Sequence, residues 1–328
     1  MTRYDAGVET DGGATTCDGP RALLLPAREV PLGGIRAMDV RRSLPQRELP
    51  TVGAWCFLDR FGPQETVMRV DPHPHIGLQT VTWPLVGEIR HRDSLGNDVV
   101  VRRGSLNIMT AGVGISHSEY SLGDDAIALD ALQLWVALPE ERRHGAPDFE
   151  RHDDLPRLSL PTLEGDRAVA TVVVGEFGSV TSPATMHTPI VGAEIALPAG
   201  SRVRVPLRSD WEHAIVRVQG DLRVVADEND DIAVQGQDLL YLGVQRDEIE
   251  VASDQGALVF LLGGEPFPDD IVMWWNFVAR SHEEIAEARE AWERGDRRYG
   301  AVTGHSPNQR VPSPPLPSVR LTTRRRRL

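Results

Sequence analysis

Residues 80–109, TVTWPLVGEIRHRDSLGNDVVVRRGSLNIM, decide the fold class of this 328-residue chain. Short runs rich in Val, Ile and Thr alternate with glycine-marked breaks, a pattern typical of neighbouring antiparallel strands. Gly96, Asn97 and Asp98 lie between two such runs and predict a hairpin turn. Further short runs, WCFLDRFGP (55–63) and ALQLWVALP (131–139), extend the pattern in both directions. The sequence therefore predicts an all-β barrel or sandwich.

The same pattern returns after a charged stretch, in AVATVVVGEF (168–177), AIVRVQGDLRVVA (214–226) and ALVFLLGG (257–264). Gly87 is followed 17 residues later by Gly104, and Gly220 is followed 16 residues later by Gly236. Both halves thus share a strand, turn, strand, glycine layout. This layout predicts a duplicated barrel.

One helix is expected near the end of the chain, at residues 281–296. Ser281 can cap its first turn with Glu284 returning the hydrogen bond, and Ile285, Ala288 and Trp292 fall on one face. The aromatic run MWWNF (273–277) is interpreted as the core anchor of this helix.

Five parts of the chain follow from these patterns. They are a disordered arm (1–20), a first barrel (21–139), a linker (140–170), a second barrel with the helix (171–298) and a disordered basic tail (299–328). The last 23 residues contain six arginines, five prolines and no acidic residue, so they could contact nucleic acid or an acidic surface, or simply be solvated.

Composition limits the other functions. The net charge of −13 and pI of 5.2 argue against nucleic acid or anionic membrane as a partner of the protein's body. Only Cys17 and Cys56 occur, which is no disulfide framework, and no apolar run is long enough to span a bilayer. We therefore expect a cytoplasmic protein in a reducing compartment.

Two pairs of polar residues stand out beside the opening stretch. In DPHPHIGLQT (71–80), His73 and His75 project from one face of an extended segment, and in GVGISHSEYS (112–121) His117 and Glu119 do the same. Pro74 suggests an edge or the start of a strand. Three imidazoles and one carboxylate suit Fe, Mn, Co, Ni, Cu or Zn. Each residue alone could equally be a polar group at a barrel mouth or a hydrogen-bonded core histidine.

The second half lacks this set. Aligning the glycines places Pro206 and Arg208 opposite the first pair and Ile249 and Val251 opposite the second. The second barrel is therefore expected to be metal-free. His213 is isolated and is interpreted as a surface or core residue.

The chain resembles the pirin family of the cupin superfamily. The similarity rests on HPHIGLQTVTW (73–83), GEIRHRDSLGN (87–97), GSLNIMTAGVGISHSE (104–119), LQLWVALP (132–139) and MWWNFVARSHEEI (273–285), and extends from about residue 21 to 292. It implies two cupin (jelly-roll) β-barrels with one metal, usually iron, in the first. By motif position the implied ligands are His73, His75, His117 and Glu119.

One position departs from the general cupin pattern, because Gln79 stands where a glutamate ligand is usual. Gln79 is therefore expected to form hydrogen bonds next to the metal ligands and not to be a ligand itself. Trp55, Phe57, Trp83 and Met109 are candidates to line a pocket, or else plain core. Arg90 and His91 are expected at the surface or at the rim.

The resemblance also implies alternative functions. Some bacterial pirins are similar to quercetin 2,3-dioxygenases, which open a flavonol ring with O₂ and release carbon monoxide; here Glu119 would be the general base and Fe(II) the expected cofactor. Other members look like redox-sensitive regulators that bind a transcription factor or a metabolic enzyme. Isomerase or decarboxylase chemistry is a third class, which no additional acid–base pair supports.

Overall fold

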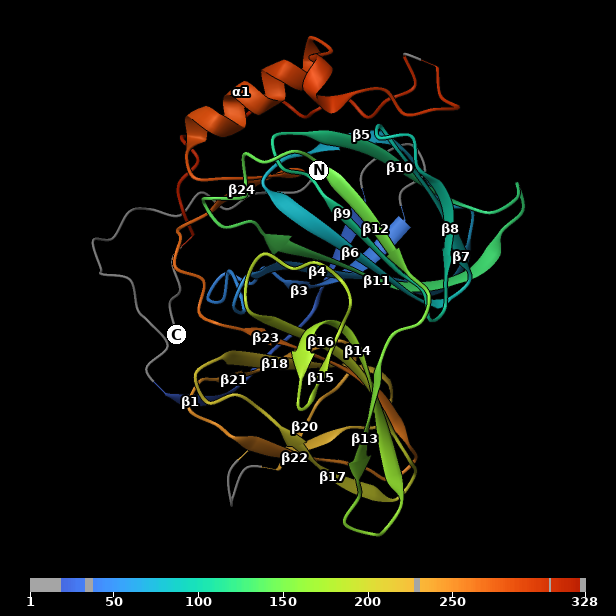
Figure 1. The fold of residues 1–328 in the computed structure, drawn as a ribbon, viewed down its shortest axis with the longest axis vertical. Helices are drawn as coiled ribbons and strands as arrows, with labels where there is room; N and C mark the ends of the chain where they lie inside the picture. Colours follow the sequence, from blue (N-terminus) through green and yellow to red (C-terminus); the bar gives the residue numbers. More distant parts are fainter. Residues whose placement is uncertain (1–18, 33–37, 227–230, 307, 325–328) are drawn as a thin grey trace.

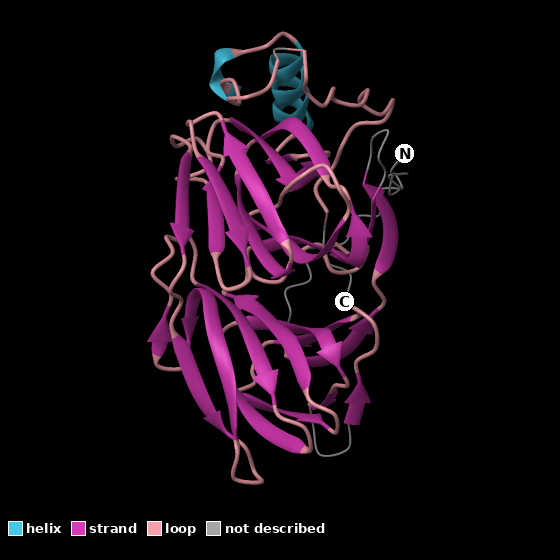
Figure 2. Ribbon diagram, turned by 90° about the vertical axis from the view of Figure 1, so that its right-hand side faces the viewer, coloured by secondary structure: helices cyan, strands magenta, loops and turns pink. Residues whose placement is uncertain are grey.

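The computed structural model describes residues 19–32, 38–226, 231–306 and 308–324. Two β-barrels pack against each other through their large sheets, and one helix lies on the far side of the first barrel (Figures 1 and 2). Each barrel consists of a large and a small antiparallel sheet. The predicted all-β, two-cupin architecture with a C-terminal helix is confirmed.

The first barrel has these strands. Its large sheet runs in the order β12 (Asp148–His152), β9 (Leu106–Thr110), β6 (Leu78–Val86), β11 (Ile127–Ala137), β4 (Trp55–Thr66), β3 (Met38–Leu44) and β2 (Arg28–Leu32). Its small sheet runs in the order β5 (Arg69–His75), β10 (Ile115–Ser121), β7 (Glu88–Asp93) and β8 (Asp98–Arg102). Strands β7 and β8 form the predicted hairpin.

The second barrel repeats this order strand for strand. Its large sheet is β1 (Pro20–Leu25), β21 (Leu239–Gly243), β18 (Glu212–Gly220), β23 (Ala257–Gly264), β16 (Ile190–Leu197), β14 (Arg167–Phe177) and β13 (Arg157–Pro161), with β15 (Val180–Thr181) on β14. Its small sheet is β17 (Ser201–Pro206), β22 (Glu248–Ser253), β19 (Arg223–Val225) and β20 (Asp231–Ala233). The predicted duplication is therefore confirmed by the sheet topology.

The glycines that suggested the duplication occupy matching turns. Gly87 follows β6 and Gly220 ends β18, with φ of +83° and +77°, a backbone conformation that other residues rarely adopt. A Cβ at Gly87 would lie 2.4 Å from the carbonyl oxygen of Ala128, and one at Gly220 would lie 1.9 Å from that of Gly256. Both turns therefore require glycine.

Each barrel is completed by one strand that lies outside its own stretch of the sequence. Strand β1, at the start of the described chain, pairs with β21 of the second barrel, and β12 pairs with β9 of the first. The expected linker (140–170) consequently contains strands of both barrels, and the expected first barrel (21–139) begins with a strand of the second. A local pattern does not reveal which distant strand completes a sheet.

The main core lies between the two large sheets. It joins apolar residues of both barrels, such as Trp55 and Val81 of the first with Phe260 and Leu262 of the second. A separate cluster fills the first barrel's interior, and another fills the second. The two barrels are thus one packed unit.

Helix α1 (His282–Glu293) follows a short hairpin, β24 (Val272–Trp274) and β25 (Phe277–Ala279), and precedes a 3₁₀ turn, η1 (Arg297–Tyr299). The Ser281 hydroxyl accepts from the backbone N–H of Glu284, as predicted. Glu284 itself accepts from Arg280 N–H rather than returning the bond to Ser281. Ile285, Ala288 and Trp292 are buried against Trp274 and Phe277, which confirms the anchor.

The C-terminal segment differs from the expected disordered tail. Residues 299–306 and 308–324 lie against α1 and the outer face of the small sheet (Figure 1). Leu316 and Leu321 pack against the cluster around Trp292, and Arg310 donates to the carbonyl oxygen of Glu293 at 2.9 Å. Arg320 is paired with Glu283, so two of the tail's arginines are bound to the protein itself. In the part of the chain that is described, no helix has the length and apolarity to cross a bilayer.

Candidate metal centre

The two predicted pairs lie on adjacent strands of the small sheet. Strand β5 is the edge strand and pairs antiparallel with β10, so that His73 is directly opposite His117. Pro74 lies between the two histidines on this edge strand, where its missing N–H interrupts no pairing inside the sheet. The pair is at the end of β5, however, and not at the start of a strand, because β5 already begins at Arg69. The side-chain alternation of each strand turns the histidines inward.

Three histidine side chains converge inside the barrel. The ligand-capable atoms of His73, His75 and His117 all lie within 4.8 Å of one another. The Nε2 atoms of His75 and His117 are 3.1 Å apart. Two nitrogen ligands at about 2.1 Å from one ion lie roughly 3.0–3.4 Å apart at tetrahedral or octahedral angles, so this spacing fits a shared metal.

Main-chain carbonyl groups orient two of these rings. His73 Nδ1 lies 2.9 Å from the carbonyl oxygen of Asp71, and His75 Nδ1 lies 3.0 Å from that of Asn276, in the β24–β25 turn. A ring that donates from Nδ1 keeps the lone pair of Nε2 available. Both histidines therefore present Nε2 to the centre.

Burial keeps the three histidines neutral. Desolvation lowers the pKa of His73 to about 4 and holds the pKa values of His75 and His117 well below the ordinary 6.5. Neutral imidazole is the form that binds a metal ion. The cluster is thus in its ligating state at neutral pH.

Glu119 belongs to a second, overlapping group. Its carboxylate, His117 and His91 offer ligand atoms within 4.8 Å of one another, and a bulge between His117 and Glu119 shifts the register against β5. Desolvation raises the pKa of Glu119, although the neighbouring His91 and Thr82 side chains oppose the rise. The four predicted ligands therefore lie in two groups that share His117.

His91 is the main residue that sequence reasoning missed. It is 3% exposed and faces the barrel interior, with its Nδ1 3.3 Å from Nδ1 of His117. The glycine alignment of the two halves could have revealed it, because His91 then matches Val224, a core residue of the second barrel. A surface or rim position would not align with a buried valine.

A row of side chains crosses the large sheet opposite the histidines. In register, from β12 to β4, the row is Phe149, Met109, Thr80, Trp135 and Phe57. Trp135 meets His75 edge to face at 5.2 Å between ring centroids, and it stacks on Phe57 at 4.0 Å. Phe57 and Met109 thus lie on the same side of the large sheet as the histidines, together with Trp135 and Phe149, which were not predicted.

Three other predicted residues face the second barrel instead. Trp55 donates from Nε1 to the carbonyl oxygens of Val191 and Gly263, each at 3.1 Å, and Gln79 donates to the carbonyl oxygen of Thr185 at 3.0 Å. Trp83 donates to Glu194 at 2.9 Å. The structure does not bring these residues to the histidines, because they lie on the other face of the large sheet.

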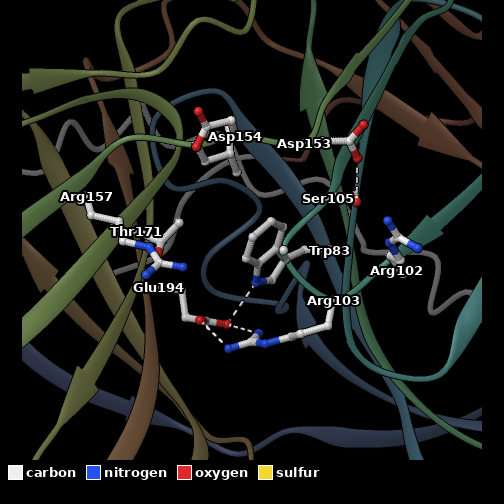
Figure 3. A pocket seen from close by; sticks show the side chains of 11 residues that line it. Trp83, Arg102, Arg103, Ser105, Asp153, Asp154, Arg157, Thr171 and Glu194 are labelled. Carbon is white, nitrogen blue, oxygen red and sulfur yellow. Dashed lines mark hydrogen bonds and ion pairs between the residues drawn. The ribbon is translucent and has the colours of Figure 1, made fainter.

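Figure 3 shows Trp83 beside a cavity of about 640 Å³ between the barrels. Its lining is polar and includes Arg103, Arg157 and Glu194, with Arg103 paired to Glu194. None of the clustered histidines lines this cavity. The wall predicted around Trp83 therefore belongs to the contact between barrels.

The second barrel is apolar at the matching positions. His91 pairs with Glu119 and Asp93 pairs with His117, just as Val224 pairs with Val251, so that Ile249 corresponds to His117. These matches of Ile249 and Val251 are the predicted ones. Val205, opposite Ile249, corresponds to His73, one residue from the predicted Pro206, because the connection after β17 is longer than that after β5.

Comparisons with known proteins agree with the geometry. A family model described as Pirin matches residues 37–136, and one described as Pirin C-terminal cupin domain matches residues 192–298. A Pseudomonas aeruginosa protein named "Putative quercetin 2,3-dioxygenase" is 43% identical over 295 residues, 89% of each chain. A Caulobacter vibrioides "Pirin-like protein" is 32% identical over 83% of this chain and 93% of its own. A crystal structure titled as quercetin 2,3-dioxygenase from Acinetobacter baumannii is 37% identical, covers 92% of this chain and 98% of its own, and superposes with a TM-score of 0.81.

Proposed function

Because this chain belongs to the pirin family, we propose that it is a metal-dependent dioxygenase that opens flavonols such as quercetin. The observation that carries the proposal is the convergence of three buried, neutral histidines with Glu119 alongside. The relatives named for quercetin 2,3-dioxygenase activity support the substrate class.

His73, His75, His117 and Glu119 would hold the metal. The 3.1 Å spacing between the Nε2 atoms of His75 and His117 and the carbonyl acceptors behind His73 and His75 fit one ion with nitrogen ligands. Fe(II) is the proposed metal, and Mn, Co, Ni, Cu and Zn suit the same donor set. Such an ion, when bound, supplies the open positions at which a flavonol oxygen and dioxygen react.

Glu119 would act as the general base. Its half-buried carboxylate can take the proton of the flavonol 3-hydroxyl, and the raised pKa caused by desolvation makes it a stronger base than a solvated glutamate. In the proposed step, the proton moves from the substrate oxygen to this carboxylate.

The aromatic row would contact the flat substrate. Trp135 and Phe57 are stacked with ring centroids 4.0 Å apart, and Trp135 borders His75. A rigid apolar wall of this kind suits a planar ring system and excludes water from it.

A single metal centre per chain is part of the proposal. Val205, Ile249, Val251 and Val224 replace the polar residues in the second barrel and pack in its apolar core. The cysteine content and the acidic charge make the cytoplasm the proposed location.

Oxygen uptake tests the proposal. Protein reconstituted with Fe(II) is mixed with quercetin, and O₂ consumption and carbon monoxide release are measured beside His117→Ala and His213→Gln. Uptake by the wild type and by His213→Gln, lost in His117→Ala, supports the enzyme. Metal bound by the wild type without uptake for Fe, Mn, Co, Ni or Cu would refute it and favour a regulatory protein that binds a partner.

A second measurement tests the ligands alone. His75→Ala should lose its metal, determined by elemental analysis, while keeping the wild-type circular dichroism spectrum. Full metal occupancy in this variant would overturn the assignment of His75.

A further inference from the structure

His117 differs from the other two histidines in what faces its second nitrogen. His73 and His75 each have a carbonyl oxygen beside Nδ1, whereas His117 has Nδ1 of His91 at 3.3 Å. Two imidazole nitrogens at this distance need one proton between them. The position of that proton decides which nitrogen of His117 is free.

The surroundings of His91 favour one arrangement. His91 Nε2 lies 3.1 Å from Oδ2 of Asp93, and a carboxylate only accepts. His91 therefore carries its proton on Nε2 and donates it to Asp93, which leaves His91 Nδ1 as an acceptor. His117 must then donate from Nδ1, and its Nε2 faces His75 with a free lone pair.

Asp93 is fixed in its acceptor role. Its side chain is fully buried at the end of β7, and it accepts from the backbone N–H groups of Leu95 and Asn97 at 2.9 and 3.1 Å. The Asn97 amide also donates to it at 2.9 Å. Burial would raise the pKa of Asp93, but the hydrogen bonds from His91 and Asn97 hold that pKa below its ordinary value.

His91 is itself held by its neighbours. Its ring stacks on Phe149 of β12, with 4.7 Å between centroids and 22° between planes. The matching residue of the second barrel is Val224, which packs in an apolar cluster. His91 and Asp93 therefore occur in the barrel that contains the histidine cluster, and a valine replaces His91 in the other barrel.

We propose that His91, backed by Asp93, is a positioning residue that fixes the tautomer and orientation of His117 as a metal ligand. The inference rests on the metal centre proposed above. His91 is not itself a ligand of that ion, because its Nδ1 faces the opposite edge of the His117 ring from the edge that faces His75. Hydrogen-bond partners behind a ligating histidine commonly change metal affinity 10- to 100-fold.

Two substitutions separate the hydrogen bond from the shape of the ring. Asparagine places Oδ1 near the position of Nδ1 and can still accept from His117, whereas phenylalanine keeps the ring against Phe149 without an acceptor. We expect His91→Phe to weaken Co(II) binding by roughly 10- to 100-fold, and His91→Asn to stay within about threefold of the wild type. His213→Gln, at a buried histidine of the second barrel, is the control and should bind Co(II) normally.

Nitrogen-15 NMR of the metal-free protein gives the second readout. The wild type and His91→Asn should show His117 protonated on Nδ1, and His91→Phe should show a mixture of tautomers. Normal Co(II) affinity in His91→Phe, or equal loss in both variants, would overturn the inference.

The two proposals fail in different ways. If the wild type binds Co(II) but its Fe(II) form does not consume O₂, only the proposed dioxygenase function is refuted. If His117 of the wild type is protonated on Nε2, the positioning role of His91 is refuted, whatever the activity.

Discussion

Ile249 of the second barrel lies at the position that His117 occupies in the first. Both residues are 2% exposed or less, and both lie on the small sheet of their barrel with side chains turned to the barrel interior. The pairing of the neighbouring strands is the same in the two sheets. The same fold is therefore built once around apolar side chains and once around imidazoles. Because buried polar groups are costly, the histidines are not required by the barrel and point to a binding role.

Replacing the histidines by their second-barrel counterparts should separate stability from binding. The double variant His73→Val with His117→Ile removes two buried imidazoles. Its free energy of unfolding should equal that of the metal-free wild type or exceed it by up to about 2 kcal/mol. It should bind no Co(II). Urea unfolding and metal titration measure both quantities, and a loss of more than about 2 kcal/mol would mean that the imidazoles hold the barrel together.

Side-chain alternation explains why each pair of polar residues could be predicted to share one face of its strand. His73 and His75, like His117 and Glu119, are two residues apart in extended strands, so each pair had to share a face. Residue types alone then indicated a metal. The structure adds the contact between the two pairs, because β5 pairs with β10 and His117 lies opposite His73.

The pocket residues were less predictable because alternation fails at a bulge. Trp55 and Phe57 are two apart, yet a register shift beside Cys56 turns Trp55 to the second barrel and Phe57 to the interior. Trp83 and Gln79 depend on which face of β6 packs against the other barrel, which sequence alternation does not specify. The C-terminal segment likewise lacks periodicity, although Leu316 and Leu321 find apolar partners.

The buried histidine of the second barrel should make stability depend on pH. Burial lowers the pKa of His213 from 6.5 to about 4, so between these values the unfolded chain binds a proton that the folded protein does not. The free energy of unfolding should therefore fall as pH drops from about 6.5 to 4, by on the order of 3 kcal/mol from this residue. Above pH 7 the contribution vanishes.

Urea unfolding of His213→Gln at pH 7.5 and 4.5 checks this expectation. Wild type and His213→Gln are both measured without metal. The buried histidines of the first barrel then add the same pH dependence of stability to both proteins, so the difference between them reports on His213. The variant should lose less free energy than the wild type, and parallel losses would rule out His213 as a source.

The C-terminal segment should stabilise the ligand strands from outside. Ser118 Oγ lies 2.9 Å from His305 Nε2, and Val311 N–H donates to the carbonyl oxygen of Pro72 at 2.9 Å. Pro72 and Ser118 are direct neighbours of His73 and His117 in the sequence. Ending the chain at Val302 should lower the melting temperature by several degrees and release Co(II) several-fold faster, because each lost hydrogen bond costs about 1 kcal/mol.

Ending the chain at Pro317 is the matched control. It removes Arg320, Leu321 and the terminal arginines but keeps His305 and Val311, so Co(II) release should stay near the wild-type rate even if the loss of the Leu321 contact lowers the melting temperature. Equal rates of Co(II) release from the two truncations would show that residues 303–317 do not support the metal centre.

Glu194 should matter for the contact between barrels and not for the metal. Its carboxylate is 5% exposed, accepts from Trp83 Nε1 and pairs with Arg103 across the barrels. Glu194→Ala leaves a buried indole N–H unpaired and should cost about 1–3 kcal/mol of unfolding free energy. Glu248→Ala, at an exposed pair with Arg204, should cost less than about 0.5 kcal/mol. Both variants should bind Co(II) like the wild type, because Glu194, on β16 of the second barrel, contacts the first barrel through Trp83 and Arg103, away from the histidines. Weakened binding in Glu194→Ala alone would instead show that the contact between the barrels controls the metal centre.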